Sequence, residues 1–360
     1  MSAVIVRPKR GHVTLATLAQ ELGVSKATVS NAYNRPQRLS AELRKQIMET
    51  AERLGYSGPD PVGATLSRGR VGAIGLVFFD DAAYPLSFAF SDPAHALYLQ
   101  GIADACSQAD TGLVLLAGAN GPRQVQTALV DGFICQYDVP TDQRIASVKA
   151  RGLPMVVVDG PAVAGHPRVG VDDCGGAAAA AEHLLALGHT RLAVLLAPAS
   201  PTLQPDADLH DESSIIYHVV RDRLRGYRGA VETAGLAWAE VSIMEARPYS
   251  HDAARLAAGR LLDRRQPPTA LIAMTDELAL GAMAAASDRG LVVPRQLSVI
   301  GFDDIPAASR ARPALTTVHQ PHYDKGHLAA QYLLKPDQLG AETVLSIGLV
   351  VRASTAPPPA

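Results

Sequence analysis

The apolar positions near the start of the chain recur at the spacing of one helix face, i, i+3, i+4 and i+7. They are Leu15, Leu18, Ala19 and Leu22. Thr14 precedes them as an N-cap, and Gly23 follows them as a terminator. Ser25 then caps a second expected helix over residues 26–33. Two short helices joined at a glycine predict a helix-turn-helix.

The outward face of the second helix is polar and free of acidic side chains. Val29 and Ala32 point inward. The outward row is Lys26, Ala27, Thr28, Ser30 and Asn31. Such side chains can donate to phosphates and base edges, as a helix in the DNA major groove must. The alternative is a helical hairpin with an ordinary solvated face. Because the row carries no acid, we favour DNA binding. A third helix is expected over residues 41–54, capped by Ser40, and completes an all-α head.

A segment rich in proline and glycine, GPDPVGATLSRGR, follows at residues 58–70. Asp60 suits an N-cap, Pro61 a first helical position and Gly69 a terminator, so about two helical turns are expected. A helix shorter than ~12 residues is not stable alone in water. We therefore expect this hinge to be helical only when DNA and a second subunit hold it, which would let a ligand bias its folding.

Short runs of valine, leucine and isoleucine alternate with helical stretches through the rest of the chain. The runs are 73–79, 113–116, 133–135, 155–158, 192–196, 270–273 and 298–301. This alternation predicts parallel sheets built from strand-helix-strand units. Because the part after residue 70 is long for one such sheet, we expect an α/β body of two lobes with a cleft between them.

The charge of the chain changes sign at residue 70. Residues 1–70 hold 11 Lys and Arg against 5 Asp and Glu, a net charge of +6, whereas the remainder holds 22 against 30, a net charge of -8. A basic head on an acidic body indicates that only the head meets a polyanion. The predicted domains are a helix-turn-helix DNA-binding domain (1–57), a hinge (58–70) and a two-lobed effector-binding and dimerisation domain (71–360).

The sequence predicts no cofactor, no metal site and no enzyme activity. The cysteines Cys106, Cys135 and Cys174 are odd in number and lack metal-ligand spacing, so buried free thiols are expected. The cluster His210, Asp211, Glu212 and His218 lies among prolines and aspartates, which indicates a solvated loop. The sequence contains no Walker, G-x-S-x-G or H-E-x-x-H motif.

The sequence also predicts a location. No apolar run approaches the roughly 18 residues that a membrane helix needs, and the first residues lack the apolar stretch of a secretory signal. A cytoplasmic protein is therefore expected.

Several motifs occur in a characteristic order. In the head they are VTLATLAQELGVSKATVSNAYN, LSAELRKQIMETAERLGY and PDPVGATLSRGR; in the body they are VGAIGLVF, AEHLLALGHTRLAVL, RLRGY, TALIAMTDELALGAM, LSVIGFDDI and PALTTVHQ. In order and spacing they resemble the LacI/GalR family of bacterial transcriptional regulators. The resemblance implies a body like that of periplasmic binding proteins, with a small ligand between its lobes. It also implies a homodimer, with larger assemblies left open, on a near-palindromic operator in double-stranded DNA.

The outward row and the resemblance together give candidate contact residues. The DNA-binding candidates are Thr14, Lys26, Ala27, Thr28, Ser30, Asn31, Asn34 and Leu66, the last matching the family's hinge leucine. The effector-binding candidates are Asp159, Arg223, Tyr249, Thr275, Asp303 and Gln320. Carboxylates, an amide and an aromatic face fit a sugar or related polyol. For the acids the alternative is a cap at a strand or helix end. That role is expected of Asp92 and Asp172, while Asp173 is expected to be a charge in the first turn of a helix.

These patterns predict a sequence-specific transcriptional regulator of the repressor type whose operator affinity is controlled by a small ligand. Two alternatives remain. A solute-binding protein of a transport system would need a signal peptide and no basic head, and a carbohydrate-active enzyme would turn its ligand over. Residues 118–131 are shorter, and residues 198–220 longer, than is usual in the family. Because the longer segment adjoins the cleft and can add a contact such as Tyr217, the identity of the ligand does not transfer.

Overall fold

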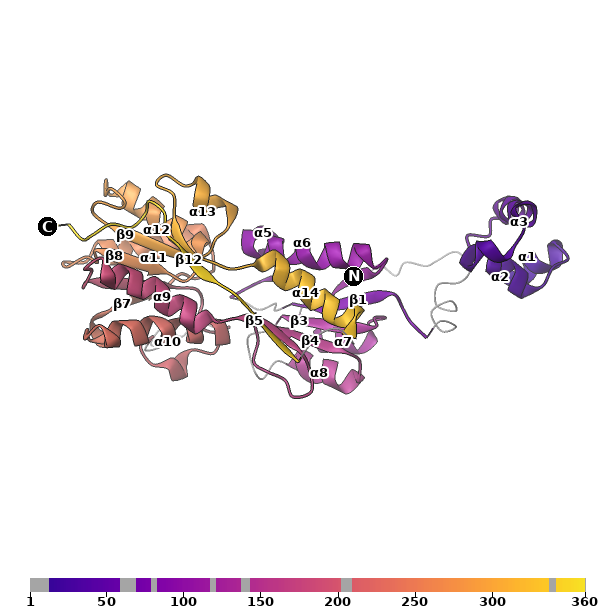
Figure 1. Cartoon of the computed structure of the whole chain (residues 1–360), viewed down its shortest axis with the longest axis horizontal. Helices are drawn as coiled ribbons and strands as arrows, with labels where there is room; N and C mark the ends of the chain where they lie inside the picture. Colours follow the sequence, from indigo (N-terminus) through magenta and orange to yellow (C-terminus); the bar gives the residue numbers. More distant parts are fainter. Residues whose placement is uncertain are drawn as a thin grey trace, which may run out of the picture. The chain divides into compact units, whose positions relative to one another are not determined.

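The chain forms two compact units, Met1–Val71 and Gly72–Ala360, here called the head and the body. The computed structural model describes residues 13–58, 69–78, 83–116, 121–136, 143–201, 209–336 and 341–359 (Figure 1). The predicted hinge helix, with Asp60, Pro61 and Leu66, lies outside the described residues.

The head consists of three short helices. Its elements are α1 (Leu15–Glu21), α2 (Lys26–Asn34), the 3-10 turn η1 (Pro36–Arg38) and α3 (Ala41–Leu54). The side chains of Thr14, Ser25 and Ser40 each accept a hydrogen bond from the backbone N–H three residues later, so the three predicted N-caps are confirmed. Gly23, with φ at +65°, makes the turn between α1 and α2.

One small core holds the head together. Leu18, Val29 and Ile47, one from each helix, are fully buried. The cluster is completed by Ala19, Ala32, Ala51 and Tyr56. Because Val29 and Ala32 face this core, as predicted, the opposite face of α2 is turned outward.

The body contains two six-stranded sheets. The first has the order β11-β5-β4-β3-β1-β2 with every pair parallel. Its strands are β1 (Ala73–Val77), β2 (Gly112–Leu116), β3 (Gly132–Gln136), β4 (Met155–Val158), β5 (Arg168–Val171) and β11 (Glu342–Leu345). The second has the order β12-β10-β9-β8-β6-β7, and in it only β12 is antiparallel to its neighbour. Its strands are β6 (Leu192–Leu196), β7 (Ser242–Glu245), β8 (Ala270–Ala273), β9 (Ser298–Asp303), β10 (Thr316–His319) and β12 (Gly348–Val350).

Helices pack on both sheets and complete two α/β lobes (Figure 1). Lobe 1, built on the first sheet, carries α5 (Leu86–Ser91), α6 (Pro93–Gln108), α7 (Gly121–Thr127), α8 (Gln143–Arg151) and α14 (His322–Leu334). Lobe 2 carries α9 (Asp173–Ala186), η2 (Glu212–Ser214), α10 (His218–Thr233), η3 (Trp238–Glu240), α11 (His251–Leu262), α12 (Asp276–Asp288) and α13 (Pro306–Arg310). The predicted two-lobed α/β body is confirmed.

The chain passes between the lobes three times, from β5 to α9, from β10 to α14 and from β11 to β12. Any relative movement of the lobes must therefore bend all three connections together.

The sequence pattern locates the long buried strands well. The runs 155–158, 192–196 and 270–273 coincide with β4, β6 and β8. The predicted run 73–79 is too long, because β1 ends at Val77. The pattern misses five strands of three or four residues, namely β5, β7, β10, β11 and β12. β4 and β8 are equally short but wholly apolar, whereas the missed strands contain polar residues or glycine and so do not stand out.

Two further expectations concern cysteines and membranes. Cys106 and Cys135 are buried as predicted, but Cys174 is partly exposed, because it lies in the first turn of α9. Within the described residues, no helix is both long and apolar enough to cross a membrane.

Two glycines bring α6 and α14 into backbone contact. A Cβ atom on Gly326 of α14 would lie 2.0 Å from the carbonyl oxygen of Tyr98, and one on Gly101 of α6 would lie 2.0 Å from that of Tyr323. A backbone oxygen cannot turn away as a side chain can. Glycine is therefore required at both positions. The crossing fixes Tyr98, whose carbonyl oxygen faces Gly326, relative to Lys325, which precedes Gly326.

We expect Gly326→Ala to destabilise the body by about 1–3 kcal/mol, because the helices must move apart to admit the methyl group. Gly229→Ala in α10 is the matched control, since nothing lies within 4 Å of its Cβ position; alanine there should stabilise the helix by about 0.5–1 kcal/mol. Urea unfolding followed by circular dichroism measures both. Equal midpoints for the two variants would show that the crossing tolerates a side chain.

Candidate functional site

A cavity of about 130 Å³ lies in the body, where the carboxyl ends of strands from both sheets meet. Lobe 1 contributes Gln136, the last residue of β3, and Asp159, which follows β4. Lobe 2 contributes Asp303, the last residue of β9. All six effector-binding candidates line this cavity: Asp159, Arg223, Tyr249, Thr275, Asp303 and Gln320. Residues far apart in the sequence are thus gathered in one place.

The guanidinium group of Arg223, on α10, is buried among carboxylates. Its Nε donates to Asp173 Oδ1 at 2.8 Å, and its Nη2 lies 3.8 Å from Asp303 Oδ1. Its Nη1 donates to the carbonyl oxygen of Met274 at 2.5 Å, and its Cζ lies 3.7 Å from the ring centre of Phe302. Burial alone would lower the pKa of Arg223, but the two carboxylates outweigh burial and raise it, so the side chain stays cationic.

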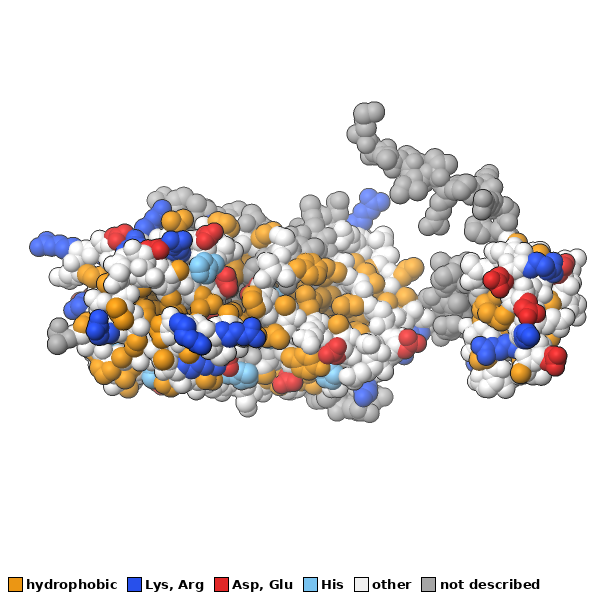
Figure 2. All heavy atoms as spheres, turned by 90° about the horizontal axis from the view of Figure 1, so that it is seen from above, with side chains coloured by type: hydrophobic (Ala, Val, Ile, Leu, Met, Phe, Trp, Pro, Cys, Tyr) orange, Lys and Arg blue, Asp and Glu red, His pale blue; other side chains and the backbone are white. Residues whose placement is uncertain are grey.

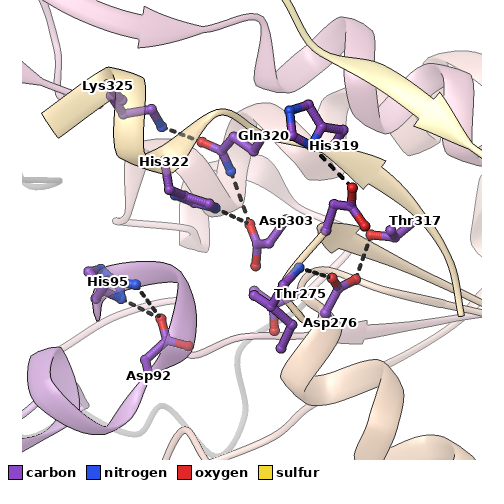
Figure 3. A network of polar contacts seen from close by, with 12 residues as sticks. Asp92, His95, Thr275, Asp276, Asp303, Thr317, His319, Gln320, His322 and Lys325 are labelled. Atoms are coloured by element: carbon purple, nitrogen blue, oxygen red, sulfur yellow. Dashed lines mark hydrogen bonds and ion pairs between the residues drawn. The ribbon is translucent and has the colours of Figure 1, made fainter. Parts of the chain in front are cut away.

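A chain of polar contacts leads from lobe 2 to lobe 1 along the cavity wall (Figure 3). The amide of Gln320 donates from Nε2 to Asp303 Oδ1 at 3.0 Å and accepts at Oε1 from the ammonium group of Lys325. Lys325 Nζ also donates to Asp159 Oδ2 at 2.8 Å. Figure 3 shows His322 beside this chain, with Nε2 at 3.5 Å from Asp303 Oδ1. Each member is held by its neighbours, so the two lobes share one polar network.

The backbone is unusual where the acids stand. Asp159 has φ at +54° and Asp303 at +120°, both in the region that favours glycine. Aspartate tolerates such angles better than most residues, but they still cost free energy. Residues held in such conformations cluster at ligand sites, which supports a binding role for this wall.

Aromatic side chains form another part of the cavity wall. Tyr84 packs against Tyr217 and Tyr249, with ring centroids 5.2 and 5.8 Å apart. The hydroxyl of Tyr249 bonds the hydroxyl of Thr275 at 2.8 Å, while Thr275 also caps α12. Burial raises the pKa of Tyr249, which keeps its phenol protonated. Tyr217, the contact expected from the long segment, therefore does lie at the cavity.

The DNA-binding candidates of the head lie on α2, except Thr14, which precedes α1. Lys26, Ala27 and Asn34 are exposed, whereas Thr28, Ser30 and Asn31 are half-buried. The hydroxyl of Thr28 bonds that of Ser25 at 2.9 Å, and Ser30 accepts from Asn34 Nδ2 at 3.2 Å. The hydroxyl of Thr14 caps α1. The hydroxyl groups of the outward row, those of Thr28 and Ser30, thus bond neighbouring side chains, whereas Lys26, Ala27 and Asn31 carry no hydroxyl group.

Comparison with known proteins identifies the family. Residues 14–58 match the model described as "Bacterial regulatory proteins, lacI family", and residues 181–355 match "Periplasmic binding protein-like domain". An HTH-type transcriptional regulator of Mycolicibacterium smegmatis is 39% identical over 98% of this chain and 98% of its own length. The chain belongs to the LacI family of bacterial transcriptional regulators.

Solved structures of LacI-family proteins agree with this assignment. A transcriptional regulator from Corynebacterium glutamicum has 32% sequence identity and a TM-score of 0.69, covering 97% of this chain and 99% of its own. A regulator from Enterococcus faecium, crystallised with bound ribose, has 25% identity and a TM-score of 0.65, covering 79% of this chain and 99% of its own. The family resemblance of the sequence motifs is therefore confirmed.

Sequence reasoning misses several residues of this LacI-family cavity. Asp172 and Asp92 cap α9 and α6 as predicted, but Asp173 is more than a first-turn charge, because it holds Arg223. Asp92 also contacts His95 at the cavity. Lys325 could have been found from its place on the buried face of α14, four residues before Ala329, since a lysine there needs a partner.

The acidic and histidine cluster of the long segment contacts protein groups instead of forming a site. His210 bonds the carbonyl oxygen of Val241 at 3.0 Å, and exposed Asp211 caps η2. Glu212 pairs with Arg225, and His218 with Asp222. In the part of the chain that the structure describes, no group of three or more His, Cys, Asp or Glu side chains is placed to hold a metal ion.

The burial of Arg223 changes what its removal should do. A ligand contact at the surface could be removed with little loss of stability, but for Arg223→Ala the structure predicts a loss of roughly 3–5 kcal/mol, because Asp173 and Asp303 would remain buried without their cation. Arg225→Ala, two residues along the same helix, is the control. Its exposed pairs with Glu212 and Asp222 are worth only about 0.2–1 kcal/mol. Thermal unfolding of both variants tests this, and similar losses would contradict it.

Proposed function

We propose that this protein is a repressor that binds a near-palindromic operator as a homodimer, with an operator affinity that changes when a polyhydroxylated small molecule occupies the cavity. The observation that carries the proposal is the polar chain from Asp303 to Asp159, which runs from one lobe to the other along the cavity wall. A molecule bound there contacts both lobes, so its binding free energy depends on how they are closed.

The chemistry of the cavity supports a sugar or related polyol. Among the contacts of the described residues, Asp303 uses only Oδ1, for Gln320, Arg223 and His322. Its second oxygen is placed to accept from a ligand hydroxyl. The tyrosine cluster offers ring faces that can cover the C–H surface of a sugar. A LacI-family neighbour crystallised with bound ribose is in keeping with this ligand class.

The head supports recognition of DNA through α2. Lys26 offers a cation, and Asn31 an amide of the kind that pairs with adenine in the major groove. We assign DNA binding to residues 1–57 and the transmission of the ligand signal to residues 58–70. Closure of the lobes would change the spacing of two such segments and thereby order or disorder them on the operator.

Exposed hydrophobic side chains of lobe 1 support a homodimer. β2 is an edge strand of its sheet, and its Leu113 is 38% exposed. Phe90 of α5 and Leu129 are more than 60% exposed. Figure 2 shows hydrophobic side chains gathered in patches on one face of the body. Such patches and edges are typical of interfaces, and a palindromic operator requires two heads.

The proposed function involves no catalytic step. The relatives that the chain matches are transcriptional regulators, and the charged groups of the cavity hold one another in pairs, an arrangement suited to binding. We place the protein in the cytoplasm, because its proposed partner is operator DNA.

Asn31→Ala tests the role assigned to α2. We expect a loss of roughly 1–3 kcal/mol on the preferred operator and a relaxed choice of base at one position in each half-site. Gln46→Ala, an exposed amide of α3, is the control and should leave the preference unchanged. Binding selections on randomised duplexes measure both, and the assignment is wrong if the Asn31 variant selects the wild-type sequences.

Asp303→Asn separates ligand response from DNA binding. The amide keeps an acceptor for Gln320 but removes a charge, which should weaken ligand binding by roughly 1.5–3 kcal/mol, or about ten- to a hundredfold. The control is Asp304→Asn, whose carboxylate pairs with Arg352. Operator affinity is measured by fluorescence anisotropy with and without a sugar that raises the melting temperature of the wild type. A wild-type response in Asp303→Asn would exclude this residue from the ligand site.

A further inference from the structure

We infer that Tyr98, Gln136 and Asp159 form a hydroxyl-binding subsite in lobe 1, which accepts an uncharged polyol and rejects its phosphorylated or carboxylated counterpart. The inference rests on the proposed function and adds two residues, Tyr98 and Gln136, that neither the sequence nor the family resemblance singles out. It also restricts the charge of the ligand.

The three side chains lie close together in the wall of the cavity. Gln136 ends β3 and is paired in register with Val158 of β4, so Asp159 stands one residue further along the neighbouring strand. Tyr98 comes from α6, where the glycine crossing with α14 fixes it. All three line the cavity, and Tyr98 and Gln136 are 1% and 8% exposed. The subsite is therefore rigid and shielded from solvent.

Each of the three side chains carries a buried polar atom that bonds no other described residue. These atoms are Tyr98 Oη, Gln136 Oε1 and Asp159 Oδ1. Buried polar atoms are nearly always hydrogen-bonded, because leaving one unpaired costs free energy. Three such atoms in one cavity wall indicate groups whose partner is a bound ligand.

The chemistry of these atoms specifies what the ligand must present. A carboxylate oxygen and an amide oxygen only accept hydrogen bonds, and a phenol both donates and accepts. Burial, reinforced by Asp159, raises the pKa of Tyr98 well above its usual value, so its phenol stays protonated. The ligand must therefore bring at least two donors to this wall, and adjacent hydroxyl groups supply them.

The charges around the subsite disfavour an anion. Four carboxyl groups line the cavity, those of Asp92, Asp159, Asp173 and Asp303, against two basic side chains, Arg223 and Lys325. Both cations are engaged among the described residues: Arg223 with Asp173 and Met274, Lys325 with Asp159 and Gln320.

The two histidines at the cavity each face a carboxyl group. His95 contacts Asp92, and His322 faces Asp303. Burial lowers the pKa of His322, which keeps it uncharged at neutral pH. A phosphate or carboxylate would lose its hydration and meet a surplus of carboxyl groups, so like-charge repulsion provides the selectivity.

Matched pairs of compounds test the charge requirement on the full-length protein. The probes are D-ribose with ribose 5-phosphate, D-glucose with glucose 6-phosphate and glucuronate, and D-galactose with galacturonate, measured by thermal shift and calorimetry. We expect at least one neutral sugar to bind, and its charged counterpart to bind at least about thirtyfold more weakly. A charged counterpart that binds as tightly would overturn the inference but leave ligand control standing. If no neutral sugar binds, both the inference and the proposed ligand class fail.

Two substitutions test the residues. Gln136→Leu removes the whole amide, Oε1 included, and Tyr98→Phe removes Oη, both with little change in size. Each should weaken binding of that neutral sugar about tenfold. Neither should lower the melting temperature of the sugar-free protein, since each removes an unpaired polar atom. Gln126→Leu, at an exposed position of α7, is the matched control and should bind as the wild type does. Wild-type affinity in both test variants would overturn the subsite, whatever the compound pairs show.

Discussion

The body depends on the burial of one guanidinium group between two carboxylates. Arg223 draws together three parts of the chain: Asp173 at the start of α9, Met274 after β8 and Asp303 at the end of β9. Without Arg223, Asp173 would lose its ion-pair partner and Asp303 would keep only uncharged partners such as Gln320, and an uncompensated buried charge costs several kcal/mol. Because α9 directly follows the connection from β5 of lobe 1, the pairing of Arg223 with Asp173 also fixes the lobe 2 end of that connection. The cavity and this connection between the lobes therefore depend on the same ion pair.

Lobe 1 is joined to this centre through Lys325 and Gln320. A lysine can be buried at 1% exposure only when its charge is matched, and Asp159 matches it. The helix that carries Lys325 can approach α6 closely because Gly101 and Gly326 lie at their crossing. Packing of small residues thus places the cation, the cation orients Asp159, and Gln320 links both to Asp303. A change in the distance between the lobes must alter at least one of these contacts.

The sequence predicts local structure better than it predicts the network. The caps at Thr14, Ser25 and Ser40 depend on neighbours three residues away, so their pattern is visible in the chain itself. The six effector-binding candidates come from family motifs, and they line one cavity. The pairing of Asp173 with Arg223 is not visible in the sequence, because an acid in the first turn of a helix already has a local explanation. Only the packing of α10 on α9 brings Arg223 to it. Gln136 and Tyr98 carry no sequence signal, since the role of Gln136 follows from the pairing of β3 with β4 and that of Tyr98 from the packing of α6 on α14.

The paired charges also limit how a ligand could act on this protein. A ligand shifts a conformational equilibrium only by its difference in affinity for the two states. An anion would gain affinity by taking Arg223 or Lys325 from an aspartate, and so would release the contacts that hold the lobes in register. A neutral polyol can instead bond Asp159 Oδ1 on one side and Asp303 on the other while Asp159 Oδ2 stays with Lys325. Its hydroxyl groups would then contact both lobes and leave the ion pairs of Arg223 and Lys325 intact. Its difference in affinity for the two states would then favour one closure of the lobes without the cost of breaking an ion pair.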